Sequence, residues 1–147
     1  MREELVTKHI MKWLVNTGWH IICYDFPQSG TGKVLHPNDH VSKTNGVLIP
    51  DIVAIKGNIA VFFENKDRYY YPDYVKQNKL IMDNAYSNDI GVLLSEYAID
   101  SIYYGIGLPS DRHQKGSIEA AHLVDFVVCV AENGTVEVPY NPRNIFS

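Results

Sequence analysis

The chain has 147 residues, of which 46% are apolar and 20% are charged. This balance is typical of a soluble globular domain and argues against a disordered tail or a membrane protein. The formal net charge of −4 argues against a protein that coats nucleic acid by bulk electrostatics, because lysine and arginine drive phosphate binding. Metal ions held by clustered carboxylates would offset that charge locally. We expect a single domain spanning residues 1–147.

The two cysteines predict a reducing environment. Cys23 and Cys129 each stand alone in an apolar stretch, without the CxxC spacing of a metal or redox site, so we expect buried free thiols. The first residues, MREELVTKHIMKWL, carry charges where a secretory signal needs an unbroken apolar core, and no later run reaches membrane-spanning length. We therefore expect a cytoplasmic protein without membrane contact.

The first part of the chain predicts a helix, a strand and a loop. Residues 2–17 form an amphipathic pattern with apolar residues at helical spacing, and Gly18 follows as a stop signal. Residues 19–26 (WHIICYDF) are predicted to form a strand. Residues 27–45 are polar and rich in Gly, Ser, His and Lys, which favours an exposed loop.

Residues 46–66 (GVLIPDIVAIKGNIAVFFENK) contain two β-rich runs on either side of Gly57 and Asn58, which predicts a tight hairpin. Both runs are apolar on both faces. A sheet built from such strands must be covered on each side, which favours an α/β sandwich over a one-sided antiparallel sheet.

The remaining elements are predicted from their length and their breakers. Residues 73–86 begin with a capping-type Asp and indicate a helix, and residues 91–96 (GVLLSE) are predicted to form a buried strand. Residues 102–108 indicate a further strand. Residues 124–138 indicate a closing hairpin that turns at Asn133-Gly134.

The first hairpin predicts a cluster of charged side chains. A two-residue turn at Gly57 and Asn58 pairs residues whose numbers have a constant sum, so Asp51 faces Glu64. Facing side chains on paired strands have Cβ atoms about 4.5 to 5.5 Å apart, close enough for two carboxylates to share a divalent ion. Lys66 follows Glu64 by two residues and therefore points to the same face.

Two facing carboxylates at the end of an apolar hairpin repel each other and lose hydration unless a cation or a shared proton neutralises them. Oxygen ligands favour Mg²⁺, with Mn²⁺ as a substitute, over zinc. A nearby ammonium can orient or activate a water molecule and stabilise charge on a phosphate. In the alternative interpretation, Asp51 ends a loop, and Glu64 and Lys66 form a solvated strand end.

Residues 50–51 (Pro-Asp) followed by residues 64–66 (Glu-Asn-Lys) resemble the motif of the PD-(D/E)xK nuclease superfamily, which includes restriction enzymes and Holliday-junction resolvases. The order of the predicted elements also resembles that family. The resemblance implies an α/β, restriction endonuclease-like αβββαβ core, with a central mixed sheet flanked by helices. It also implies Mg²⁺-dependent hydrolysis of DNA that leaves 5′-phosphate and 3′-hydroxyl ends.

The resemblance implies two further site residues. Family members often add an acid from the first helix as a metal ligand, and Glu3 and Glu4 both qualify. Helical periodicity favours Glu3, which shares the inward stripe of Val6, although first-turn acids are also favoured by the helix dipole alone. Gln77 lies on the helix after the motif, where several relatives place a glutamine near the metal. In the alternative interpretation, Gln77 is only a solvated helix residue.

Basic side chains around the motif are candidates for contacts to DNA phosphates. The residues 69–71 (Tyr-Tyr-Tyr) either stack on bases or pack against the end of the sheet. The basic candidates are Lys33, Lys43, Arg68, Lys76, Lys79, Arg112 and Lys115.

Two other motifs carry less weight. Residues 29–34 (SGTGKV) are similar to a phosphate-binding loop, but Pro27 stands where its first Gly belongs and Val34 where Ser or Thr would bind magnesium, so we expect no nucleotide cofactor. Residues 36–40 (HPNDH) offer metal-binding side chains, although solvated side chains are more common in such a loop.

Three functions fit these residues. A sequence-specific endonuclease of the restriction or homing type is favoured by the acidic balance, because a structure-specific resolvase or repair nuclease needs a broadly basic face. A non-catalytic DNA-binding subunit is the third, and the intact set of Asp51, Glu64 and Lys66 argues against it. We expect a homodimer or a higher symmetric homo-oligomer, because a unit of this size cuts both strands of DNA only as two copies.

Overall fold

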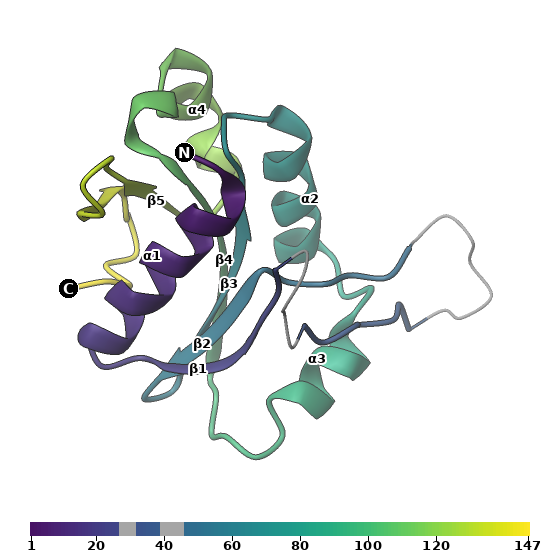
Figure 1. The fold of residues 1–147 in the computed structure, drawn as a ribbon. Coiled ribbons are helices and arrows are strands. Elements are labelled where there is room, and N and C mark those ends of the chain that lie inside the picture. The colour runs from purple at the N-terminus through teal and green to yellow at the C-terminus, as the bar shows by residue number, and fades with distance from the viewer. Residues whose placement is uncertain (27–31, 39–45) are drawn as a thin grey trace.

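The computed structural model describes residues 1–26, 32–38 and 46–147 (Figure 1). Among these residues, no helix combines the length and the apolar composition that crossing a membrane would require. The helices are α1 (Glu3–Asn16), α2 (Tyr71–Met82), α3 (Ser87–Leu93) and α4 (Lys115–Ala120), with short 3-10 turns η1 (Ser110–Arg112) and η2 (Ala121–Leu123). The strands are β1 (His20–Tyr24), β2 (Ile52–Lys56), β3 (Ile59–Asn65), β4 (Ser101–Pro109), β5 (Phe126–Val130) and β6 (Val136–Tyr140).

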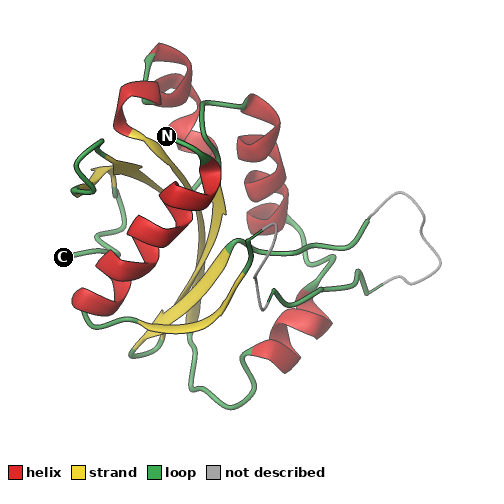
Figure 2. Ribbon diagram, viewed as in Figure 1, coloured by secondary structure: helices red, strands yellow, loops and turns green. Residues whose placement is uncertain are grey.

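The strands of the described ranges form one six-stranded sheet in the order β1-β2-β3-β4-β5-β6. The pairs β1–β2, β2–β3 and β5–β6 are antiparallel, whereas β3–β4 and β4–β5 are parallel. The sheet is therefore mixed, and helices flank it (Figure 2). This confirms the predicted α/β class with a mixed sheet flanked by helices.

One face of the sheet is covered by α1. Val6, Ile10 and Leu14 of this helix are fully buried and belong to the same core cluster as Val61 and Phe63 of β3. The spacing of the three helical residues gives α1 a single apolar stripe, as its periodicity predicted.

The opposite face is covered by α2 and α3. Phe62 of β3 packs in a cluster with Ile90 and Leu94 of the α3 segment. Tyr74 of α2 packs with Leu108 of β4 in a neighbouring cluster. Successive side chains of a strand point to opposite faces, and residues 59–63 of β3 are all apolar because helices cover both faces there. This confirms the prediction of a sheet covered on both sides.

The first hairpin has the predicted register. Lys56 pairs with Ile59, and the antiparallel ladder continues to Ile52 opposite Phe63. Gly57 adopts a left-handed conformation with φ of 59°, which glycine tolerates without a Cβ clash. The tight turn therefore sets which residues face each other along the two strands.

The closing hairpin is also confirmed. β5 and β6 pair antiparallel, and Gly134 in the turn has a positive φ of 89°. The backbone N–H of Gly134 donates to the carbonyl oxygen of Ala131 at 2.8 Å. Cys23 and Cys129 are both buried and free, as predicted.

The predicted strand at residues 91–96 is wrong. The first part of this segment lies in α3, and Leu94 follows the helix as its cap. Ile90 and Leu94, four residues apart, are buried on one side, while Val92 between them is 73% exposed. A short apolar run is compatible with either a helix or a strand, and packing against the sheet decided for the helix.

The predicted exposed loop at residues 27–45 is partly wrong. Residues 27–31 and 39–45 lie outside the described residues, but Leu35 is buried and forms an isolated antiparallel bridge with Leu48. Both leucines pack in the cluster that contains Phe62, so this stretch contributes to the core. The predicted helix at residues 73–86 is real but ends at Met82.

Aromatic packing around Phe146 gives a test of the fold. The Phe146 ring lies 5.1 Å from Trp13, 5.3 Å from Trp19 and 5.0 Å from Phe126, measured between ring centroids. We expect Phe146→Ala to lower the free energy of unfolding by about 3 kcal/mol, because it leaves a cavity among these rings. Urea denaturation measures this loss. Ile118→Ala, at a side chain that is 59% exposed, is the control, and equal losses in the two variants would contradict the packing argument.

Candidate active site

The candidate site lies at the edge of the sheet where β2 begins and β3 ends. Asp51 directly precedes β2, and its backbone N–H donates to the carbonyl oxygen of Phe63 at 3.1 Å. The pairing of the hairpin thus continues beyond its last ladder pair and brings Asp51 beside Glu64. Since Val53 and Phe62 face α3, Asp51 and Glu64 lie two residues along on the same face, on the side of α2.

Asp51 is held in place by the backbone of the neighbouring strand. Its Oδ2 accepts a hydrogen bond from the backbone N–H of Asn65 at 2.7 Å. Burial, together with the negative charge of Glu64, raises the pKa of Asp51 to about 8, although the Asn65 hydrogen bond opposes both. A cation bound beside Asp51 would therefore offset the electrostatic cost of ionising this buried carboxylate next to Glu64.

Glu64 has a cationic partner on α2. Its Oε2 lies 3.3 Å from Nζ of Lys76, and its side chain is 13% exposed. Burial raises the pKa of Glu64, whereas the charge of Lys76 lowers it. The pair of carboxylates is thus only partly neutralised by the protein itself.

Lys66 lies between an acid and an aromatic ring. Its Nζ is 4.0 Å from Oδ2 of Asp73 and 5.3 Å from the ring centroid of Tyr70. Its side chain is 34% exposed, so the ammonium remains accessible from solvent. The interpretation of residues 64–66 as a fully solvated strand end does not fit, because Asn65 is completely buried and Glu64 nearly so.

Asp73 is a site residue that the sequence reasoning missed. It was predicted only as a helix cap, but it is 7% exposed, and its Oδ2 has no hydrogen-bond partner among the described residues. Burial raises its pKa, and the charges of Lys66 and Lys76 lower it. The one signal in the sequence was an acid in the first turn of the helix that follows the motif.

Glu3 reaches the same end of the sheet from α1. Partial burial raises its pKa, the charge of Lys66 lowers it, and the charges of Asp67 and Asp73 raise it. Glu4 instead pairs with Lys8 at 3.3 Å across one turn of the helix. Of the two acids, Glu3 is therefore the one that shares the electrostatic surroundings of the motif.

Gln77 does not lie among the carboxylates. It is buried, and its Nε2 donates to the carbonyl oxygen of Gly105 at 2.8 Å and to that of Phe62 at 3.3 Å. These bonds tie α2 to β3 and β4. The interpretation of Gln77 as a solvated helix residue is wrong, and its contacts favour a structural role over a catalytic one.

The predicted DNA-contacting residues lie on several elements. Lys76 and Lys79 lie one turn apart on α2 and are exposed, and Arg68 pairs with Asp67 at 3.8 Å. The other described candidates, Lys33, Arg112 and Lys115, are exposed, and Lys43 lies outside the described residues.

The three tyrosines at positions 69 to 71 divide between the two predicted roles. The Tyr69 ring lies 5.4 Å from that of Tyr74 and also approaches Gly116, so it packs. Tyr70 and Tyr71 are 48% and 53% exposed and are available to a partner.

Of the possible metal-binding motif at residues 36–40, Asp39 and His40 lie outside the described residues.

The carboxylates suit a metal ion that is completed by other ligands. In the part of the chain that the structure describes, no three His, Cys, Asp or Glu side chains are close enough together to enclose a metal ion. Mg²⁺ is commonly bound by one or two carboxylates, with water and substrate phosphates filling its other positions. Asp51 and Glu64 fit that role, because they are oxygen ligands, adjacent and incompletely neutralised.

Comparison of the chain with protein-family models, with curated proteins and with solved structures found no match.

Proposed function

We propose that this protein is a Mg²⁺-dependent DNA endonuclease of the PD-(D/E)xK type, built on a restriction endonuclease-like αβββαβ core. The observation that carries the proposal is the meeting of Asp51, Glu64 and Lys66 at one end of the β2–β3 hairpin. Two neighbouring, largely buried carboxylates with raised pKa values favour a bound cation, and an accessible ammonium stands beside them. The order of α1, β1, β2, β3, α2 and β4 also supports it.

Each residue has a defined part in the proposed reaction. Asp51 and Glu64 would hold Mg²⁺, with Glu3 as a further ligand directly or through water. Mg²⁺ bound there would supply Lewis-acid stabilisation of the charge that develops on the phosphate. Lys66 would orient the attacking water through its ammonium group while the water's proton passes to solvent, as the P–O bond to the 3′ oxygen breaks and leaves a 5′-phosphate and, after protonation, a 3′-hydroxyl.

The substrate follows from the resemblance and from the lysines of α2. Lys76 lies beside Glu64, and Lys79 follows it on α2 by one turn, so the two could contact successive phosphates near the scissile bond. We propose sequence-specific cutting by a homodimer, with structure-specific cutting of junctions or repair intermediates as the alternative. The first needs two copies of the site, one for each strand.

The experiment that tests this function is cleavage of a substrate panel with Mg²⁺: supercoiled plasmid, linear duplex and a four-way junction. Discrete plasmid fragments support sequence-specific cutting, and cleavage of the junction alone supports the structure-specific alternative. Binding without cleavage of any substrate, with Mg²⁺ or Mn²⁺, would overturn the nuclease proposal in favour of a binding subunit.

The role of Glu3 can be tested against its neighbour. We expect Glu3→Gln to weaken Mg²⁺ binding about tenfold, because groups around a metal commonly change its affinity 10- to 100-fold. Glu4→Gln is the matched control, since Glu4 pairs with Lys8 on the surface. Calorimetric titration with Mg²⁺ or Mn²⁺ measures both. Equal affinities for the two variants would remove Glu3 from the site.

A further inference from the structure

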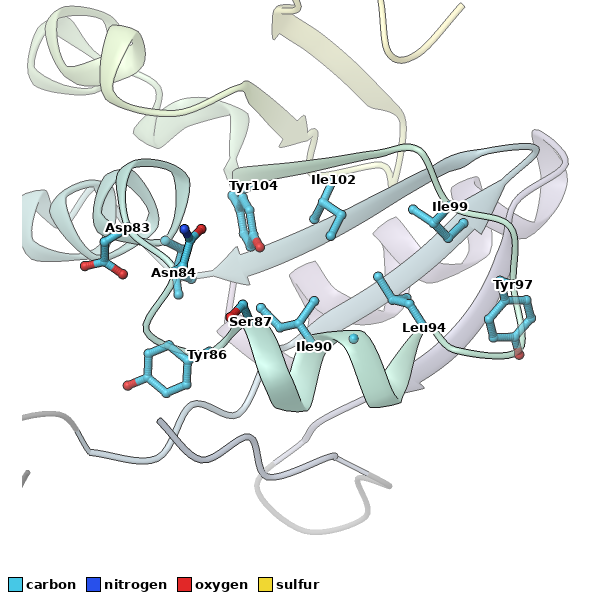
Figure 3. A pocket seen from close by; sticks show the side chains of 12 residues that line it. Asp83, Asn84, Tyr86, Ser87, Ile90, Leu94, Tyr97, Ile99, Ile102 and Tyr104 are labelled. Carbon is cyan, nitrogen blue, oxygen red and sulfur yellow. The ribbon is translucent and has the colours of Figure 1, made fainter. Parts of the chain in front are cut away.

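A cavity of about 320 Å³ lies between α3 and β4, away from the carboxylates (Figure 3). Its apolar walls include Ile90 and Leu94 of the α3 segment and Ile102 of β4, and tyrosine rings line it as well. Asp83 and Asn84, which follow α2, line one end of it, Ser87 lies next to Ile90, and Tyr97 lies at the other end (Figure 3). Apolar walls of this size with a few polar groups are typical of a small-molecule pocket.

A second hollow, of about 160 Å³, lies next to this cavity. The two hollows share Leu80, Asp83 and Tyr86 as lining residues. The second hollow is also lined by Lys79 and by Lys76, the residue that contacts Glu64 at 3.3 Å. The two hollows therefore lie next to each other beside α2, and Lys76 links the smaller one to Glu64.

The side chains that line the two hollows indicate which chemical groups a ligand would carry. The two lysines suit phosphate groups, whereas the carboxylate of Asp83 at one end of the cavity repels them. One oxygen of Asp83 accepts the N–H of Ala85 at 3.0 Å, and the other accepts from no described residue. An aromatic ring that carries N–H donors satisfies both the apolar walls and this carboxylate.

We propose that this cavity is a nucleobase pocket, which holds an unpaired base of the DNA strand while Lys76 and Lys79 hold the phosphates that link it to the scissile bond. The inference rests on the proposed nuclease function and deepens it by naming the substrate class. A base can enter such a pocket only after leaving the base stack, which is least costly in mismatched, damaged or single-stranded DNA. The preferred substrate is therefore DNA with an unpaired nucleotide near the cleaved bond, which favours the structure-specific alternative over sequence-specific cutting.

Gly91 offers a way to fill the pocket. It lines the cavity on α3, one turn from Ser87 and Leu94, and an added Cβ would meet no atom within 4 Å. Gly91→Leu therefore places a branched side chain at the pocket while improving the helix propensity of α3. Val92→Leu is the matched control, because Val92 is 73% exposed on the same helix and does not line this cavity.

The first measurement is an NMR titration of the full chain, without metal, with dAMP, dCMP or dTMP and with deoxyribose 5-phosphate. We expect base-dependent shifts at Ile90, Leu94 and Tyr104, larger for dAMP and dCMP because their exocyclic amines can donate to Asp83. Contacts between base protons and the methyl groups of Leu94 and Ile102 locate the base directly in the unmodified protein. Gly91→Leu should abolish these shifts, and Val92→Leu should retain them.

Shifts that are the same with deoxyribose 5-phosphate, that map elsewhere or that survive in Gly91→Leu would overturn the inference.

The second measurement is cleavage of duplexes with and without an unpaired nucleotide. We expect at least a tenfold preference for the unpaired substrate, which Gly91→Leu lowers to about one. The two proposals fail separately. Base binding without cleavage counts only against the nuclease, and duplex cleavage with an empty pocket counts only against the nucleobase pocket.

Discussion

Lys66→Ala is expected to lower the rate of DNA cleavage by at least about 10²- to 10³-fold, as does the loss of other charge-stabilising donors in active sites. The ammonium of Lys66 is accessible, whereas that of Lys76 is paired with Glu64 at 3.3 Å. Removal of Lys66 therefore takes away the cation that is proposed to orient water and stabilise charge on the phosphate. Single-turnover cleavage with excess protein and Mg²⁺ measures the chemical step apart from product release. DNA affinity should change far less.

The control for this loss is Lys12→Ala. Lys12 is exposed on α1 and belongs to no candidate site, so its replacement should leave the single-turnover rate within about twofold. Circular dichroism and thermal unfolding show whether both variants keep the fold. Full cleavage by Lys66→Ala would end the assignment of Lys66 and, with it, the proposed mechanism.

Without metal, the protein should become less stable as the pH rises from about 4 to about 8. The fold raises the pKa of Asp51 from 3.8 to about 8, so the folded state binds a proton that the unfolded state has already released in this range. The free energy of unfolding therefore falls as the pH rises through the window. One pKa unit corresponds to about 1.4 kcal/mol, so a shift of this size predicts a loss of several kcal/mol across the window.

Mg²⁺ should reverse this loss most strongly at the upper end of the window, because it binds the ionised carboxylates and competes with protons. Thermal unfolding between pH 5 and pH 8.5, with EDTA or with Mg²⁺, measures both effects. Asp51→Asn should raise the melting temperature at pH 8 in EDTA and abolish the stabilisation by Mg²⁺. Asp111→Asn, at an exposed acid in η1, is the control. A stability without metal that rises with pH would contradict the burial of Asp51 beside Glu64.

Some features of the fold lay beyond local patterns. The apolar run at residues 91–94 is compatible with a helix or a strand. Contacts of Ile90 and Leu94 with a distant part of the sheet made the segment a helix. Leu35 sits in a polar stretch, and it is buried because Leu48 and Phe62 lie beside it in space. Periodicity within a short window does not contain such information.

By itself, the sequence determined the α/β class and the register of the first hairpin. The register was readable because a two-residue turn at Gly57 leaves only one pairing of the strands, which brings Asp51 opposite Glu64. Only the tertiary structure decided that Asp73 lies beside Lys66, that Lys76 pairs with Glu64, and that Gln77 binds backbone carbonyls. These contacts depend on how α2 docks on the sheet, which many distant side chains fix together and which no local sequence pattern records.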